Sequence, residues 1–218
     1  MSLWPWLSLA LLGAYHGINP GMGWLFAVAL GLQERSRKAL LQALLPIALG
    51  HCASVAATVA LVRGLQVVTS PPLLRGLGAA ALIGFGLYKF LGPRSHPRWV
   101  GMRVSLRELV LWSFLMSTAH GAGLMLFPVL LGLPAMDHSQ HARPYTEVAA
   151  GAALVGDSIA QGLAAVLVHT LAMLLAMSAT AIAVYEKLGL AMLRRAWVNL
   201  DALWAVAVIA AGIFTLFV

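Results

Sequence analysis

The chain has 218 residues, of which 61% are hydrophobic and only 10% charged, and its mean hydropathy is +0.89. A soluble domain carries about 25% charged residues, so this composition excludes an ordinary soluble domain, a disordered chain, a coiled coil and a disulfide scaffold. The net charge of +7 does not indicate nucleic-acid binding, because the basic residues are spread over the connections between apolar segments and do not follow one helix face.

Six apolar segments follow one another along the chain, and each approaches or exceeds the roughly 20 residues that a membrane-spanning helix needs. Charges and prolines bound these segments at 5–32, 39–62, 72–91, 106–133, 150–185 and 199–218. The pattern predicts an all-α polytopic membrane protein with six transmembrane helices, in a single transmembrane domain over residues 1–218 that has the lipid bilayer as its surroundings. No basic stretch precedes the first segment, so we expect no cleaved signal peptide.

Basic residues are concentrated in the first, third and fifth connections, around Arg37, Arg98 and Arg194. Short loops that are rich in Lys and Arg stay on the cytoplasmic side of a membrane. The sequence therefore predicts that both termini lie outside, in what we expect to be a bacterial inner membrane.

Two stretches of the chain resemble each other. Ala14-Tyr-His-Gly17, followed by Leu25-Phe-Ala-Val, matches Thr118-Ala-His-Gly121, followed by Leu126-Phe-Pro-Val, and the next long segment of each half carries one histidine. This likeness predicts two three-helix repeats, 5–91 and 106–218, that enter the membrane in opposite orientations, as in many secondary transporters. Chance likeness among leucine- and glycine-rich helices is the alternative.

Four histidines, His16, His51, His120 and His169, lie inside apolar segments and close to their middles, which predicts one common depth in the bilayer. An ionisable side chain at that depth is costly and indicates a functional site. Neutral imidazole binds zinc, copper, iron and nickel. We therefore expect these histidines to be metal ligands, with helix-bridging hydrogen bonds as the alternative.

The first segment carries a broken motif after its histidine. Pro20 removes an N–H from the helix, and irregular backbone inside a membrane is tolerated only where it lines a cavity or is buried in protein. We expect Gly17, Asn19, Pro20 and Gly21 to line a substrate pathway, with Gly121 as the counterpart in the second half. A proline kink that serves only packing is the alternative.

Two further residues are candidates for the same pathway. Cys52 follows His51 directly, and Asp157 precedes His169 by about three helical turns. The alternatives are a small buried residue for Cys52 and an acid at a helix end for Asp157. Because Cys52 is the only cysteine, no intramolecular dithiol cycle is available, which disfavours a membrane oxidoreductase or assembly factor.

The motifs His16-Gly-x-Asn-Pro-Gly21, Gly50-His51-x-x-Ser54 and His120-Gly121, on six segments in two halves, resemble the lysine-exporter (LysE) superfamily. Within it, the chain is most similar to nickel/cobalt efflux-type and related metal permeases. The resemblance implies a small transporter that moves a metal cation or another small solute by alternating access.

These observations together predict a secondary transporter and not an enzyme, since nothing in the chain resembles a P-loop for ATP hydrolysis. We expect no permanent cofactor; the transported ion would be nickel, cobalt, zinc, copper or iron. The sequence leaves the direction of transport and a homo-oligomeric state open. The rival hypotheses are a membrane electron-transfer protein with bis-histidine haem b and an exporter of another small solute.

Overall fold

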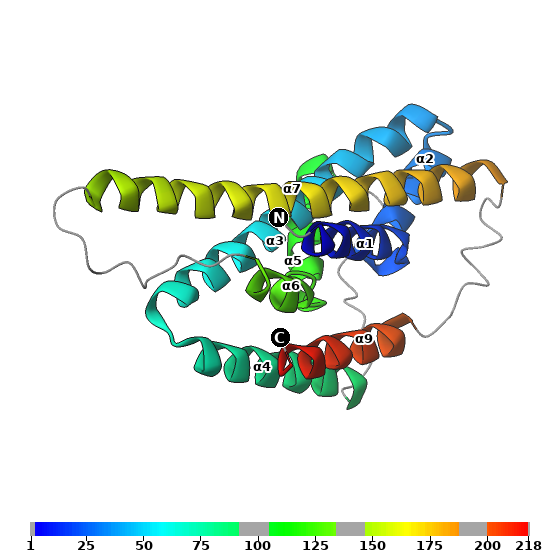
Figure 1. Ribbon diagram of the computed structural model, residues 1–218. Helices are drawn as coiled ribbons and strands as arrows, with labels where there is room; N and C mark the ends of the chain where they lie inside the picture. The colour runs from blue at the N-terminus through cyan, green and yellow to red at the C-terminus, as the bar shows by residue number, and fades with distance from the viewer. Residues whose placement is uncertain (1–2, 92–104, 134–146, 188–199, 218) are drawn as a thin grey trace.

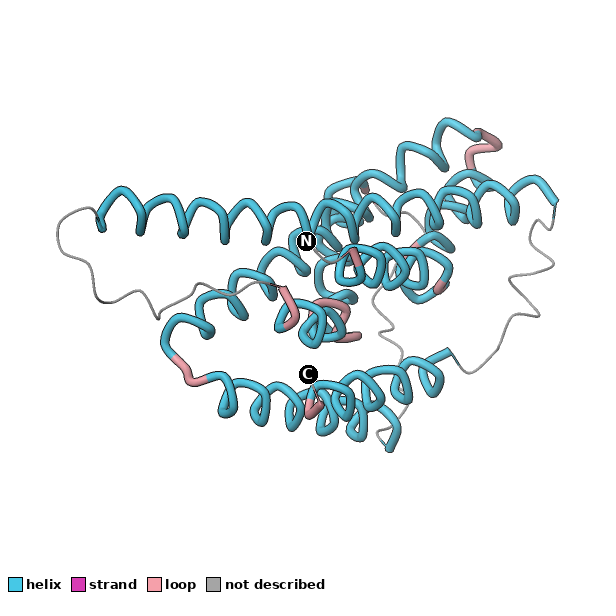
Figure 2. Tube along the Cα trace, viewed as in Figure 1, coloured by secondary structure: helices cyan, strands magenta, loops and turns pink. Residues whose placement is uncertain are grey.

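A computed structural model describes residues 3–91, 105–133, 147–187 and 200–217, and for 147–158 and 200–203 it describes the backbone alone. Throughout these residues the chain is helical, and no strand occurs among them. Figure 2 shows the helices joined by short loops. The predicted all-α class is therefore confirmed for this part of the chain.

The helices have the following bounds in chain order: α1 (Trp4–Ile18), α2 (Trp24–Gln33), α3 (Arg37–Val68), α4 (Pro71–Leu91), α5 (Leu106–Ala119), α6 (Phe127–Leu131), α7 (Glu147–Lys187) and α9 (Leu200–Thr215). Two short 3-10 helices, η1 (Pro20–Met22) and η2 (Leu124–Leu126), lie at breaks in the first and fourth predicted segments.

Three helices of the described residues are long and apolar enough to cross a membrane: Arg37–Val68, Pro71–Leu91 and Ile159–Lys187. Leu106–His120 and Leu124–Leu131 are bent by 52° relative to each other, and together they form a fourth candidate span if they count as one. Such helices are those of an integral membrane protein. The predicted six spans are not seen among the described residues, in part because the first and fourth predicted segments each divide into shorter helices.

The first segment breaks where its proline requires it. The residue before a proline disfavours helical geometry, and Asn19 is extended, with φ −67° and ψ 119°. The Asn19 side chain then accepts a hydrogen bond from the Gly21 N–H at 2.9 Å. Gly23 takes φ 112°, which glycine adopts without steric cost, and turns the chain into α2.

The fourth segment breaks directly after its histidine. Ser105 and Glu108 form a reciprocal capping box that starts α5, and the helix ends at Ala119. Gly121 follows with φ 69°, again in the left-handed region, before the chain continues into η2 and α6. The loop from His120 to Gly123 is therefore a real interruption and not a gentle bend.

The second segment is longer than predicted. Ser36 caps α3 by accepting a hydrogen bond from the Ala39 N–H at 3.2 Å, and the helix continues to Val68 although the sequence predicts an end near residue 62. Arg63 does not end it, because the side chain is partly buried along the helix and bonds Gln66 at 3.2 Å. The helix stops just before Pro71, which begins α4.

The helices pack in pairs. In Figure 1, α7 crosses the molecule above α1 and α3, while α4 and α9 lie side by side as a separate layer below them. The closest pairs are α1 with α7, α5 with α3 and α4 with α9, and α3 also packs against α7. The short helix α6 contacts α9, α1 and α3, so it lies between the two layers.

Two apolar clusters fill the interior. One includes Val55 of α3, Val166 of α7 and Trp204 of α9, and the other includes Ile47 of α3 and Met173 of α7. His51 and His169 therefore occupy the stretches of α3 and α7 where one cluster ends and the next begins.

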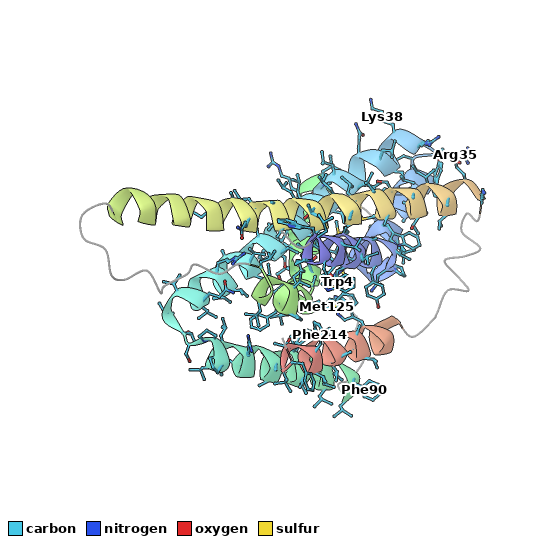
Figure 3. The ribbon with its side chains drawn as sticks, viewed as in Figure 1. Trp4, Arg35, Lys38, Phe90, Met125 and Phe214 are labelled. Atoms are coloured by element: carbon cyan, nitrogen blue, oxygen red, sulfur yellow. The ribbon has the colours of Figure 1, made fainter. Side chains whose placement is uncertain are left out.

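The connection between α2 and α3 places positive charge at one end of the molecule. Figure 3 shows Arg35 and Lys38 pointing outward there. Arg37 pairs with Glu186 near the end of α7 at 3.1 Å. This ion pair joins the beginning of α3 to the end of α7, so the two helices run antiparallel.

Candidate functional site

Three of the four predicted histidines meet in the interior. His16, His51 and His169 come from α1, α3 and α7, and their side chains are 0%, 1% and 0% exposed. Their ring centroids lie 4.9 Å apart for His16 and His169, and 5.4 Å apart for each of the other two pairs. We call these three side chains the histidine cluster.

Within the cluster, two nitrogens point toward the same place. His51 Nε2 and His169 Nε2 are 3.3 Å apart, whereas the centroids of the two rings are 5.4 Å apart. The rings therefore diverge away from their Nε2 atoms. The two Nε2 atoms therefore lie between the rings and face each other.

Hydrogen bonds at Nδ1 fix the protonation of two rings. His16 Nδ1 donates to the Leu12 carbonyl at 2.6 Å, and His169 Nδ1 donates to the Leu9 carbonyl at 3.2 Å. Because a carbonyl oxygen only accepts, each neutral imidazole must carry its proton on Nδ1. Both rings consequently present a lone pair at Nε2.

His51 differs in its Nδ1 partner, which is the hydroxyl of Ser117 on α5, 2.9 Å away. A hydroxyl can donate or accept, so this contact alone does not fix the proton of His51. Ser113, one turn earlier on α5, donates to the Ile47 carbonyl of α3 at 2.7 Å. A third polar contact between α5 and this part of α3 joins the hydroxyls of Thr118 and Ser54 at 2.9 Å.

The Nε2 atom of His16 is buried and has no hydrogen-bond partner. A buried polar atom without a partner costs about 1–3 kcal/mol. His16 packs edge-on against both other rings of the cluster, so its orphan lone pair lies in the same part of the interior as the His51–His169 pair.

His120 lies beside the cluster and not in it. Its Nδ1 donates to the Met116 carbonyl at 2.8 Å, and it follows the last residue of α5. Trp204 of α9 contacts both His120 and the cluster: its ring centroid is 6.5 Å from that of His120 and 4.7 Å from that of His16. His120 is thus a neighbour of the three clustered histidines.

The four histidines differ in their distance from the ends of their helices. His51 and His169 lie well inside long helices, whereas His16 is two residues from the end of α1 and His120 is just past the end of α5. The two broken helices place their ends at the site.

The predicted pathway residues of the first break take different roles. Asn19 is buried and its side-chain oxygen serves as the cap for Gly21, while Pro20 begins η1 and is partly exposed. A Cβ atom at Gly21 would lie 3.7 Å from His120 Nε2. The first break therefore faces the histidine of the second break.

Gly17 and Gly121 serve close packing. A Cβ atom at Gly17 would lie 2.3 Å from the Met173 carbonyl oxygen of α7, and one at Gly121 would lie 2.8 Å from the Phe85 ring of α4. Gly17 thus lets α1 approach the backbone of α7, and that approach brings His16 to His169.

Cys52 is partly exposed and packs against the apolar cluster that contains Val55 and Trp204. Its thiol is free, and its placement beside that cluster is the one expected of a small apolar residue. Asp157 belongs to α7, but the structure describes only its backbone and not its side chain.

Three contact residues of the site are not among the predicted ones. Ser117 meets His51, Trp204 donates its indole N–H to the His120 carbonyl, and Tyr15 stacks on Trp204 with ring centroids 5.7 Å apart. One signal in the sequence was available for Ser117, since Ser113 and Ser117 are four residues apart in an apolar helix and so share a face. Trp204 carries no such signal, because α9 is brought to the site only by tertiary packing.

The site contains no assembled ligand set of the usual kind. Over the residues whose side chains are described, no three or more His, Cys, Asp or Glu side chains are grouped so that they could hold a metal ion. Comparisons of the chain with protein-family models, with curated proteins and with solved structures give no match.

Proposed function

We propose that the protein is a secondary transporter that moves a divalent transition-metal cation across the membrane through the histidine cluster. The observation that carries this proposal is the 3.3 Å separation of His51 Nε2 and His169 Nε2. Two imidazole nitrogens at the usual 2.0–2.1 Å from one tetrahedral zinc ion are about 3.3–3.4 Å apart. The pair therefore has the spacing of two ligands to a single ion.

The hydrogen bonds at Nδ1 support the same proposal. Histidines that bind metals almost always donate their other ring N–H to a carbonyl, a carboxylate or water. His16 and His169 do so to Leu12 and Leu9. His16, with its buried and unpartnered Nε2, is the third ligand that we assign to the ion. A small rotation of His16 would complete the set.

An incomplete ligand set is compatible with transport. A site that conducts an ion must bind it well enough to admit it and weakly enough to release it. The His51–His169 pair would hold the ion first, and His16 would join it as α1 and α7 adjust. His120, next to Gly21, would be reached by the ion on its way to or from the cluster.

The proposal includes two repeats of opposite orientation, 5–91 and 106–218, in six spans. Several helix pairs are compatible with this division, because α1 packs on α7 as α5 packs on α3, and the pairs α3–α7 and α4–α9 join equivalent helices of the two halves. The packing of α2 on α3 has no such counterpart between α6 and α7 among the described residues. The two breaks also correspond: His16 and His120 each bond the carbonyl four residues earlier, that of Leu12 and of Met116. Such repeats commonly place the substrate between them.

The geometry of the histidine pair disfavours haem. Two axial histidines lie on opposite sides of a haem iron, with their nitrogens about 4 Å apart and the porphyrin between them. His51 Nε2 and His169 Nε2 face each other at only 3.3 Å, which is shorter than this separation and leaves no room for a porphyrin between them. A porphyrin would have to separate these rings, whereas a single ion would join them.

The test combines analysis of the bound metal or haem with a measurement of metal flux. Purified protein is analysed for bound metal and for a Soret absorption band, and is then titrated with Co²⁺, whose visible spectrum reports nitrogen ligation. Proteoliposomes with an entrapped metal-sensitive dye measure movement of Zn²⁺, Co²⁺ and Ni²⁺. We expect one bound ion, no Soret band, and flux that is lost in His51→Ala. A stoichiometric Soret band would establish the haem alternative, and the absence of both binding and flux would leave another small solute as the substrate.

A further inference from the structure

His51 is the one intramembrane histidine whose Nδ1 meets a hydroxyl. The other three, His16, His120 and His169, donate from Nδ1 to main-chain carbonyl groups. Their protons are therefore fixed on Nδ1. Among the four, only His51 can move its proton from one ring nitrogen to the other and keep a hydrogen bond at Nδ1. The reason is that its partner, the Ser117 hydroxyl at 2.9 Å, can either donate or accept.

Without a cation, the proton of His51 lies on Nε2. His169 Nε2 is a lone pair, because His169 Nδ1 donates to the Leu9 carbonyl. The 3.3 Å contact between the two Nε2 atoms is then a hydrogen bond in which His51 donates and His169 accepts. His51 Nδ1 is consequently an acceptor, and the Ser117 hydroxyl donates to it.

With a cation between the two Nε2 atoms, this arrangement cannot persist. A metal ion binds the lone pair of an imidazole nitrogen, so His51 Nε2 must lose its proton. A neutral imidazole then carries its proton on Nδ1, where it needs an acceptor. Ser117 can become that acceptor, because its own hydroxyl proton can turn to the carbonyl four residues back, a common partner of serine inside a helix.

We propose that Ser117 is a positioning residue that lets His51 change tautomer between the empty and the cation-bound site. This inference rests on the proposed function for the bound state only. The proton count does not change, since His51 gives one proton from Nε2 to water and takes one from water at Nδ1. Ser117 keeps its proton and only reverses the direction of its hydrogen bond.

Ser113 supplies a matched control. Ser113 and Ser117 are one turn apart on α5, each is 2% exposed, and each bonds α3. Ser113 donates to a main-chain carbonyl, that of Ile47, and does not contact an imidazole. Removing either hydroxyl therefore removes one hydrogen bond between the same two helices, but only Ser117→Ala deprives His51 of its partner.

The experiment measures tautomers directly. Protein labelled with ¹⁵N-histidine is studied by NMR in detergent micelles, with His51 assigned through the signals lost in His51→Gln, before and after addition of Zn²⁺. We expect His51 to carry its proton on Nε2 without metal and on Nδ1 with Zn²⁺, while the other three intramembrane histidines stay protonated on Nδ1. A His51 that is protonated on Nδ1 in the metal-free protein would overturn the proposal.

Zinc affinity, measured by calorimetry, provides the second readout. Removing a partner of a metal-bound histidine typically lowers metal affinity by about 10–100-fold. We expect that loss in Ser117→Ala, recovery in Ser117→Thr, which retains a hydroxyl, and an affinity close to that of the parent in Ser113→Ala. An equal loss in Ser113→Ala and Ser117→Ala would reduce Ser117 to a packing contact. If the parent does not bind Zn²⁺, the proposed function fails, and the tautomer of the metal-free protein still decides the hydrogen bonding assigned to Ser117 and His51.

Discussion

His51 and His169 are separated by 118 residues in the chain, yet their Nε2 atoms lie 3.3 Å apart at the crossing of α3 and α7. Both side chains are almost completely buried, so their ring nitrogens are not exposed to bulk water. The pair is thus one of several places in the interior where the two halves of the chain bring polar atoms together.

The two histidines should act as one unit in cation binding. We expect His51→Ala and His169→Ala each to lower Zn²⁺ affinity at least tenfold, which corresponds to about 1.4 kcal/mol. The double variant should lose little more, because residues that share one ligand are not additive when removed. Calorimetric titration of the three variants measures this. Losses that simply add would indicate two independent positions.

Acidification should weaken cation binding. A proton and a metal ion compete for the same Nε2 lone pairs of the histidine cluster, so the affinity for Zn²⁺ falls as the pH falls and recovers as it rises. Titrations in a series of buffers measure the dependence, and the release of protons on binding can be recorded in the same experiment. An affinity that does not change with pH would argue against imidazole ligands.

Two glycines of the first break should respond differently to one added methyl group. In Gly17→Ala the new Cβ would lie 2.3 Å from the Met173 carbonyl oxygen, which is a steric clash. The nearest atom to a Cβ at Gly21 is 3.3 Å away. Overpacking of this kind typically costs about 1–3 kcal/mol. We expect a lower midpoint of thermal unfolding in Gly17→Ala and nearly the parent value in Gly21→Ala.

The same pair separates packing from transport. In Gly21→Ala the new methyl group lies near His120 Nε2, at 3.7 Å, so cation flux should fall although the fold is retained. Proteoliposome flux, normalised to inserted protein, measures this effect. Parent-like flux in Gly21→Ala would show that the first break is not on the path of the ion.

The indole N–H of Trp204 should stabilise the second break. Trp204→Phe removes the hydrogen bond to the His120 carbonyl that joins α9 to the end of α5. Loss of one buried hydrogen bond that leaves an acceptor behind costs about 1–3 kcal/mol. We expect a lower unfolding midpoint and altered flux, since the same ring packs on His16.

Trp24 provides the comparison for Trp204. Its indole N–H donates to the Ile18 carbonyl at 3.0 Å and so closes the first break within its own half of the chain. Trp24→Phe should lower stability by a similar amount. Because no hydrogen bond or ring contact among the described residues links Trp24 to the rings of the histidine cluster, cation flux in Trp24→Phe should stay near that of the parent. Equal changes in flux in the two variants would show that Trp204 has no particular role at the site.

The two ends of α3 should be accessible from opposite sides of the membrane. With 32 residues, α3 is about 48 Å long, which exceeds the roughly 30 Å of a bilayer core. In a Cys52→Ser background, an impermeant maleimide added outside should label Ser70→Cys and not Lys38→Cys. Both positions are exposed on the protein surface. The reverse pattern of labelling would invert the proposed orientation.

The sequence by itself determined the class of the protein and the chemistry of its candidate site. Composition excluded a soluble domain, and the apolar segments gave the order of the helices, because burial of apolar side chains and backbone hydrogen bonding leave helices as the natural form of such segments in a membrane. Proline and glycine marked the first break, since Pro20 and Gly23 impose backbone geometry locally. Histidine within apolar segments indicated the site, because imidazole is rare and costly there.

Only the tertiary structure decided which of these residues meet. The placement of His16 beside His169 depends on the close approach of α1 to α7 at Gly17, and that of Trp204 beside His120 depends on α9, which is distant in sequence. The Nδ1 partners of His169 and His51, Leu9 and Ser117, are likewise distant in sequence, whereas those of His16 and His120 lie four residues earlier on the same helix. Helical periodicity specifies which face a residue occupies on its own helix, but it does not specify which helix packs against that face.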